Sequence, residues 1–371
     1  MGPGGPGAGP GRCACPLTWS TKMMTDKREE AQASIYIRPP FPKSLSILRT
    51  VRPQQPPLFP PASDRSGGRT MAALVGDVAY WLAEHPDIVG FRWSPSGLWF
   101  STWAFLLGFL ATYVSLCLAA DALLRRRKPL PLGPLPPAHA LLMAAVSATI
   151  FAGTLLSAVA EIRDTRWSWR GRSRTTPLRW LLCFPPGTRS SGRVFFWSYA
   201  YYLSRYLHAA RGAFAVVRRR RGAAARVFAH AASVAMAFLW LEFSQSFQVL
   251  AILASTLAHA VAFGFRFWVD SAGLPAARAA RSGSAPVALG CQLGLLGCNL
   301  VCHAGVVWMH FGGAMAGGCS GIGAWVVNTL LNAALLWVFL HCYGTRGVCD
   351  DDGGAAAAAA ALKKKKKKKE M

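Results

Sequence analysis

Three basic side chains interrupt an otherwise apolar stretch of the sequence, residues 194–217. Arg205, His208 and Arg211 recur at every third position, so a helix would carry them on one broad face. In a bilayer, ionisable groups of this kind cost about 2.5–3.5 kcal/mol each at the centre of a span. They are tolerated where they face the interior of a helix bundle, and we therefore expect a polar or ligand-filled chamber there.

Later apolar stretches carry further polar groups at helical spacing. Ser255, His259 and Phe263 recur every four residues and form one stripe, and Ser233 follows His230 by about one turn. Arg266 lies about one turn beyond Phe263, and the stretch 287–308 contributes Gln292, Asn299 and His303, which can also serve as hydrogen bonds between helices. Because these groups come from different helices, they can meet only inside the bundle.

Less specific readings of these polar groups also exist. A lone histidine inside a membrane can serve only as a hydrogen-bonding residue between helices. We expect no metal centre, because no predicted helix supplies two histidines within one turn. The ten cysteines lie mostly in apolar stretches without paired spacing, which predicts no disulfide framework. Arginine-rich loops beside a membrane favour lipid headgroups or an anionic ligand over nucleic acid.

The composition identifies the elements that must position these residues. Of the 371 residues, 53% are apolar and 15% are charged, against about a quarter charged in a soluble domain. Seven runs meet the requirement of roughly 20 mostly apolar residues for each bilayer crossing. The expected spans are 99–124, 140–160, 194–217, 227–243, 249–268, 287–308 and 322–343. We therefore predict an all-α membrane protein with about seven transmembrane helices in a bundle.

The charges in the loops indicate an orientation. With the C-terminus in the cytosol, the cytosolic loops hold the basic run 125–128, the run 218–221 together with Arg226, and the pair Arg278 and Arg281. The loops after the fourth and sixth spans then face the lumen and carry no lysine or arginine. The segment 161–193 is an exception, because it would be lumenal yet holds eight arginines. Either this segment re-enters or lies on the bundle, or the number of spans differs by one.

The formal net charge of +25 is concentrated partly in the two ends of the chain. Residues 1–70 contain twelve of the 24 prolines, which excludes regular helix and central strand. We interpret them as a disordered extension, with a start-site artefact before Met71 or a targeting segment as alternatives. Residues 71–348 form the predicted membrane domain, and residues 349–371 a disordered cytosolic tail with an alanine spacer and a polylysine run.

The last residues of the tail suggest a location. Lys368 and Lys369 stand fourth and third from the C-terminus, as in the dilysine retrieval signal of endoplasmic reticulum membrane proteins. A lysine run can instead bind anionic lipid headgroups, at about 1 kcal/mol for each lysine. Both readings require a cytosolic C-terminus.

Residues 227–233 carry a motif with a recognisable form. His230 and Ser233 match the central histidine and the hydroxyl of a box written His-x-x-His-His-Ala-Thr, whereas Val227 and Ala231 replace its other two histidines. This box is typical of the ELO family of very-long-chain fatty acid elongases, which are 3-oxoacyl-CoA synthases. The chain resembles the divergent plant-type branch of that family from about residue 71 to residue 343.

Three further motifs carry the resemblance. His259 keeps the histidine of a family motif Asn-x-x-x-His, in which Ser255 replaces the asparagine. Of the family's Gln-x-x-Gln pair, Gln292 is kept. The family signature Lys-x-x-Glu-x-x-Asp-Thr corresponds here to Arg205, His208, Arg211 and Gly212.

The resemblance implies a reaction and a set of roles. An acyl-CoA would be extended by two carbons from malonyl-CoA, with loss of CO2, to a 3-oxoacyl-CoA, and the bundle would enclose an acyl tunnel. His230 would take up the acyl group or act as the base, with His259 assisting. The residues expected to bind substrate are Arg205, Arg211, Ser233, Ser255, Phe263, Arg266 and Gln292, with the arginines at CoA phosphates or the malonyl carboxylate.

The resemblance also implies a cellular setting. No cofactor is expected besides the substrates acyl-CoA and malonyl-CoA. The expected partners are membrane lipids and the reductases and dehydratase of the elongation cycle. The resemblance is compatible with a homodimer, and no nucleic acid is expected. The expected location is the endoplasmic reticulum membrane, in very-long-chain fatty acid and sphingolipid synthesis. The alternatives are a non-catalytic elongase-like lipid-binding subunit and, less favoured, a small-solute transporter.

Overall fold

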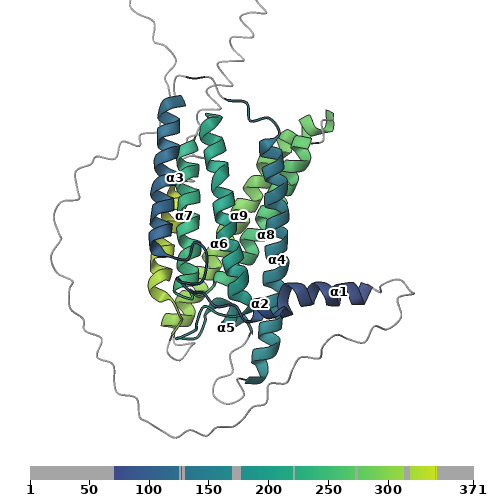
Figure 1. Cartoon of the computed structure of the whole chain (residues 1–371), viewed down its shortest axis with the longest axis vertical. Coiled ribbons are helices and arrows are strands. Elements are labelled where there is room, and N and C mark those ends of the chain that lie inside the picture. Colours follow the sequence, from purple (N-terminus) through teal and green to yellow (C-terminus); the bar gives the residue numbers. More distant parts are fainter. Residues whose placement is uncertain are drawn as a thin grey trace, which may run out of the picture. The chain divides into compact units, whose positions relative to one another are not determined.

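A computed structural model of the chain gives the arrangement of its membrane domain (Figure 1). The residues that it describes are 71–124, 127, 130–168, 177–219, 222–271, 275–312, 318–338 and 340. The predictions for residues 1–70 and 349–371, including Lys368 and Lys369, fall outside these residues.

The described residues form helices and turns, with one isolated β-bridge between Arg92 and Ser191. The helices are α1 (Met71–Ala79), η1 (Tyr80–Glu84), α2 (Pro86–Val89), α3 (Trp103–Leu124), α4 (Leu135–Ser168), α5 (Pro177–Leu182), α6 (Arg193–Val217), α7 (Ala223–Glu242), α8 (Gln248–Ser271), α9 (Pro275–Phe311) and a last helix, Ile322–Val338. The long helices stand side by side as a bundle, and α1 projects sideways from its lower end in Figure 1.

Each of the seven predicted apolar segments contains a helix, although the first helix begins at Trp103 rather than at residue 99. Five of the described helices are long and apolar enough to cross a membrane: Trp103–Leu124, Leu135–Asp164, Ala223–Glu242, Gln248–Ser271 and Val287–Phe311. Lipid offers no hydrogen-bond partners to backbone N–H and C=O groups. A helix pairs these groups with one another, so apolar segments of this length become helices. The predicted all-α membrane bundle is confirmed, whereas the count of seven spans stays a prediction.

The packing order places four helices around one interior. The helix α6 packs against α7 on one side and α4 on the other, and α4 also packs against α8. The outer helices α3 and α9 pack against α7 and α8, respectively. The polar residues predicted on α6, α7 and α8 therefore lie on neighbouring elements.

One glycine sets how closely α4 approaches α6. A Cβ atom added at Gly153 would lie 2.0 Å from the Trp197 ring, a distance that side chains do not reach. The Trp197 indole is buried and donates a hydrogen bond to the Leu82 carbonyl oxygen at 2.8 Å. This contact joins α4, α6 and η1 at the lower end of the bundle.

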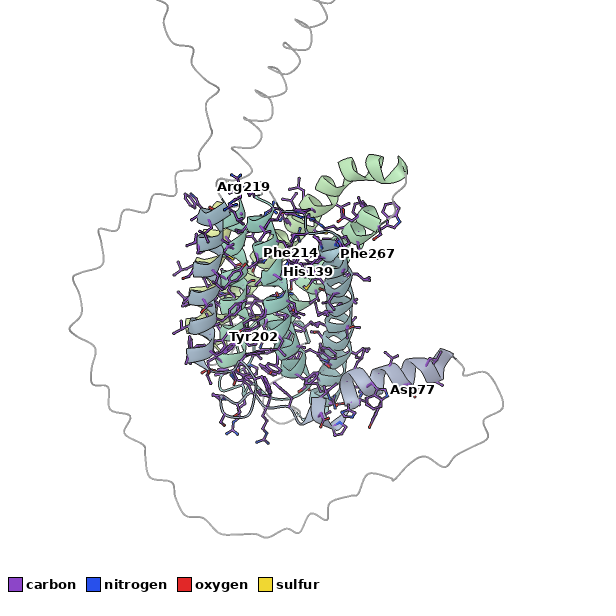
Figure 2. The ribbon with its side chains drawn as sticks, turned by 45° about the horizontal axis from the view of Figure 1, so that its top comes forward. Asp77, His139, Tyr202, Phe214, Arg219 and Phe267 are labelled. Atoms are coloured by element: carbon purple, nitrogen blue, oxygen red, sulfur yellow. A yellow bond between two sulfur atoms is a disulfide. The ribbon has the colours of Figure 1, made fainter. Side chains whose placement is uncertain are left out.

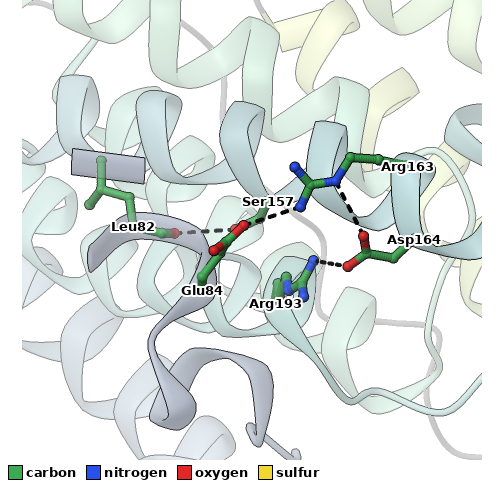
Figure 3. A network of polar contacts seen from close by, with 6 residues as sticks. All are labelled: Leu82, Glu84, Ser157, Arg163, Asp164 and Arg193. Carbon is green, nitrogen blue, oxygen red and sulfur yellow. Dashed lines mark hydrogen bonds and ion pairs between the residues drawn. The ribbon is translucent and has the colours of Figure 1, made fainter. Parts of the chain in front are cut away.

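Ion pairs neutralise part of the arginine charge at the same end (Figure 3). Arg163 contacts Glu84 of η1 at 3.1 Å, and Arg193 contacts Asp164 at 2.7 Å. Asp164 also lies 3.3 Å from Arg163, which completes a network of alternating charges. Within the exceptional segment 161–193, these arginines are therefore paired with acids.

The described part of the segment 161–193 that follows α4 also packs on the bundle. Within it, α5 packs against α8 and α9. Directly after α5, the backbone N–H of Phe184 donates to the Ser246 hydroxyl oxygen, and the backbone N–H of Ser320 donates to the Phe184 carbonyl oxygen. These bonds join the segment to the turn between α7 and α8 and to the start of the last helix.

A disulfide bond between Cys183 and Cys319 contradicts the expectation of no disulfides. The two cysteines are 136 residues apart, with a Cα–Cα distance of 5.1 Å. Sequence spacing could not indicate this pair, because only the folded bundle brings the two loops together. The other cysteines of the described residues that are free lie in helices: Cys117, Cys291, Cys298 and Cys302.

We predict that Gly153→Ala destabilises the bundle, because the new methyl group must displace Trp197 or separate α4 from α6. The expected loss is about 1–3 kcal/mol in the free energy of unfolding, as for overpacked cores. Thermal unfolding in detergent measures it. Gly264→Ala is the matched control, since a Cβ at Gly264 of α8 meets nothing within 4 Å. Equal melting temperatures for both variants would contradict the prediction.

Candidate active site

A buried guanidinium lies at the centre of the bundle. Arg205 is 1% exposed, and its Cζ atom lies 4.2 Å from the centroid of the Tyr201 ring. Its Nη2 donates to the hydroxyl of Ser204 at 3.0 Å, and its Nη1 lies 3.3 Å from Nδ1 of His208 and 3.4 Å from Nδ1 of His259. None of these partners is a carboxylate, so the surroundings hold a cation without neutralising it.

Three imidazoles from three helices meet beside this cation, and two of them, His208 and His259, contact it. The His208 ring on α6 has its centroid 4.6 Å from that of His230 on α7 and 4.7 Å from that of His259 on α8. His208 is buried, and the other two are half-buried. Sequence analysis placed His230 and His259 together as catalytic candidates, and the structure places both beside His208.

A glycine on α6 makes room for His230. A Cβ atom at Gly212 would lie 2.1 Å from the hydroxyl oxygen of Tyr113 and 3.1 Å from Cδ2 of His230. Tyr113 of α3 uses that hydroxyl to donate to the Ala209 carbonyl oxygen at 2.9 Å. The absence of a side chain at this position therefore lets α3 and α7 both close onto α6.

The two predicted serines have different surroundings. Ser255 on α8 lies 3.1 Å from the Tyr201 hydroxyl, the same ring on which Arg205 stacks. Ser233 on α7 donates to the carbonyl oxygen of His230 at 2.9 Å, within its own helix. Ser255 is thus connected to the cluster through Tyr201, whereas the hydroxyl bond of Ser233 is local.

Phe263 connects the imidazoles to a pocket. Its ring centroid lies 5.3 Å from that of His208 and 5.9 Å from that of His259, and Arg211 stacks on the same ring at 4.9 Å. Both Phe263 and Arg211 also line a small open pocket with a cavity of about 40 Å³. The pocket lining is Pro136, His139, Ala140, Arg211, Phe214, Ala215, Arg218, Arg226, Phe263 and Arg266.

This pocket lies toward the end of the bundle where α6 meets α7. Figure 2 shows His139 and Phe214 toward the end that carries Arg219, with Tyr202 toward the opposite end. His139 holds α4 against α6 by a 2.9 Å hydrogen bond to the Leu207 carbonyl oxygen. Four arginines from three helices line one pocket, an arrangement suited to a multiply charged anion such as a phosphate chain.

The structure separates two predicted residues from the imidazole cluster. Arg266 lines the pocket and forms an ion pair with Asp270 at 3.6 Å. Gln292 has an exposed side chain on α9. The described contacts among the three imidazoles, Arg205 and Phe263 come from α6, α7 and α8, and α9 contributes none of them.

Polar residues of α9 form a second, separate set. His303 lies 3.2 Å from Thr329 and 3.4 Å from Asn332 of the last helix, and Asn299 donates to Asn332 at 3.1 Å. These contacts agree with the structural reading of such groups as hydrogen bonds between helices. Among the residues that the structure describes, no group of three or more His, Cys, Asp or Glu is arranged to hold a metal ion.

Sequence reasoning missed three kinds of site residue. His208 was placed on the polar face of its helix but not among the site residues. Arg218 and Arg226 were read only as charges that set the orientation, and His139 was not singled out. The three-residue spacing of Arg205, His208 and Arg211 was the signal that could have found His208. No signal in the sequence relates His139 to residues on α6.

Comparisons with known proteins assign the family. The pattern of the ELO: GNS1/SUR4 family matches residues 98–346, which include all the helices that build the imidazole cluster. The chain belongs to the ELO family. It is also 53% identical over 275 residues to an Arabidopsis thaliana protein named "Fatty acid elongase 3-like", covering 73% of this chain and 92% of that protein.

Membership of the ELO family agrees with a multi-pass helical membrane protein. No solved structure matches the chain. In the structure, His230, at the histidine-box position of the ELO family, faces His208 in the basic signature of α6.

Proposed function

We propose that the chain is a fatty acid elongase condensing enzyme, a 3-oxoacyl-CoA synthase that joins acyl-CoA and malonyl-CoA. The observation that carries the proposal is the cluster of imidazoles around Arg205, connected through Phe263 to an arginine-lined pocket. The Arabidopsis relative's name supports the same activity. A non-catalytic subunit or a transporter would not require three imidazoles to meet beside a buried arginine.

The proposed reaction proceeds in two steps. The His230 imidazole attacks the acyl thioester, so that a C–N bond forms, the C–S bond breaks and CoA leaves as a thiol with the imidazole's proton. Malonyl-CoA then loses CO2, and the electron pair of the broken C–C bond forms an enolate. The enolate attacks the acyl carbon, the C–N bond breaks, and the imidazole recovers a proton from solvent. His259 assists from α8.

The pocket arginines suit the CoA part of both substrates. Arg211, Arg218, Arg226 and Arg266 can donate to phosphate oxygens at the mouth, while the acyl chain extends into the bundle. Arg205 is buried deeper and contacts no carboxylate among the described residues, so it suits the malonyl carboxylate. No cofactor beyond these two substrates is part of the proposal.

The proposed location is the endoplasmic reticulum membrane, with the arginine pocket and the C-terminus on the cytosolic side. The disulfide between Cys183 and Cys319 supports this orientation, because disulfides persist on the oxidising side of a membrane. The proposed partners are membrane lipids and the reductases and dehydratase that complete the cycle of very-long-chain fatty acid and sphingolipid synthesis.

We predict that His230→Ala abolishes condensation, because the acyl acceptor is removed. The purified chain is given acyl-CoA and malonyl-CoA, and the 3-oxoacyl-CoA is measured, with lipid profiling of an elongase-deficient cell as a second readout. His85→Ala is the control, since His85 caps α2 and lies outside the cluster. Equal turnover by His230→Ala and the wild-type chain would exclude the mechanism.

We also predict that the pocket arginines bind the CoA phosphates. Arg218→Gln and Arg226→Gln should each raise KM for acyl-CoA roughly tenfold, equivalent to about 1.4 kcal/mol, and weaken the salt dependence. The control is Arg219→Gln, because the Arg219 guanidinium donates to the Arg127 carbonyl oxygen at 2.8 Å and does not line the pocket. Equal KM increases in all three variants would argue against specific binding.

The orientation has its own test. An N-glycosylation acceptor inserted at the Gly187 turn should be glycosylated in the endoplasmic reticulum, and the same acceptor placed after residue 349 should not. The reverse pattern would overturn the orientation but leave the condensation chemistry standing. Enzymatic removal of the glycan, followed by gel mobility, verifies each modification.

A further inference from the structure

His208 is a third imidazole at the centre, and the proposed reaction does not yet use it. It is 7% exposed, and its ring contacts those of His230, His259 and Phe263. It also lies within hydrogen-bonding distance of Arg205. The residue thus touches every group that the proposed reaction needs around the acyl acceptor.

Arg205 fixes the tautomers of two of the imidazoles. A guanidinium can only donate, so each ring nitrogen that bonds to it must accept. The acceptors are Nδ1 of His208 and Nδ1 of His259, at 3.3 and 3.4 Å from the same Nη1, which has two hydrogens to give. Both rings are therefore neutral, with their remaining proton on Nε2.

The two Nε2–H groups must point away from Arg205. In an imidazole, Nδ1 and Nε2 lie on different sides of the ring, so a ring that turns Nδ1 to the guanidinium directs Nε2 elsewhere. His230 has no hydrogen bond to Arg205 among the described residues, and its ring nitrogens are not constrained in this way. The cluster thus contains two fixed N–H donors and one imidazole without that restraint.

We propose that His208 is a catalytic N–H donor that, with His259, stabilises the negative charge on the thioester oxygen during condensation. This inference rests on the proposed function and deepens it. Negative charge develops on the acyl carbonyl oxygen when His230 attacks the thioester, and again on the same oxygen when the enolate attacks the acyl carbon bound to His230. Fixed donors in a site that excludes water stabilise such an oxyanion without reorganising.

The donor role and a purely structural role require different atoms of the His208 ring. A structural role would need only the acceptor Nδ1, which holds Arg205 in place. A shorter polar side chain that reaches Arg205 would then do as well as histidine. The oxyanion role instead requires the Nε2–H, which faces away from the arginine.

Two amide substitutions separate these roles. In His208→Asn, the short amide oxygen can accept from Arg205 near the place of Nδ1, but nothing reaches the place of Nε2. In His208→Gln, the amide nitrogen reaches the place of Nε2 and can donate there. We expect kcat of His208→Asn to fall at least 100-fold, as when an oxyanion donor is lost, and kcat of His208→Gln to stay within about tenfold of wild type.

The experiment uses the full chain in detergent or liposomes, with acyl-CoA and malonyl-CoA as substrates. KM for acyl-CoA should be unchanged in both variants, because the pocket arginines are intact, and melting temperatures should agree. Wild-type kcat in His208→Asn would overturn the proposal, as would an equal loss in both variants with equal melting temperatures. A melting temperature lowered only in His208→Asn, with kcat recovered at lower temperature, would assign a structural role and also overturn it.

The same measurements distinguish failure of this inference from failure of the proposed function. If the wild-type chain forms no 3-oxoacyl-CoA, the condensing activity itself is wrong. If the wild-type chain is active, His230→Ala is inactive and His208→Asn is fully active, the condensing activity stands and the donor role of His208 is wrong.

Discussion

A buried cation without a carboxylate partner organises the interior of this bundle. Arg205 directs its donors to a serine hydroxyl and two imidazole nitrogens, and its flat face lies on the Tyr201 ring. Neutral partners of this kind solvate a charge but leave its field intact, so an uncompensated buried charge stays costly. An anionic group entering the cluster lowers that cost. The need to hold Arg205 therefore fixes the histidine orientations and, at the same time, creates affinity for an anion.

The two ends of the bundle use arginine in opposite ways. At the lower end, Arg163 and Arg193 meet Glu84 and Asp164 in a network that cancels charge and fastens η1 to α4 and α6. At the other end, four arginines from three helices line one pocket, where their mutual repulsion favours a bound anion. The number of arginines in the segment 161–193 therefore does not by itself indicate the side of the membrane, because Arg163 and Arg193 are paired with acids.

Apolar run length predicted the helices well, because lipid leaves the backbone few alternatives. The site was predicted in part. Periodicity placed Arg205, His208 and Arg211 on one face, but which of them meets His230 depends on how α6 packs between α4 and α7. The disulfide between Cys183 and Cys319 depends on contacts between distant loops, which no local pattern encodes. The sequence does not show how the helices pack against one another, and that packing is what brings the imidazoles together.

Histidine at position 208 has a physical consequence beyond supplying a third ring. A carboxylate there, as in the family signature, would lie within reach of Arg205, form a salt bridge and neutralise it. The imidazole instead accepts one hydrogen bond and leaves the arginine's charge uncompensated. A histidine in place of the acid therefore leaves the buried charge of Arg205 without a counter-ion at this position. In the proposed function, a buried arginine without a carboxylate among its described contacts replaces an internal ion pair, and the substrate supplies the anion.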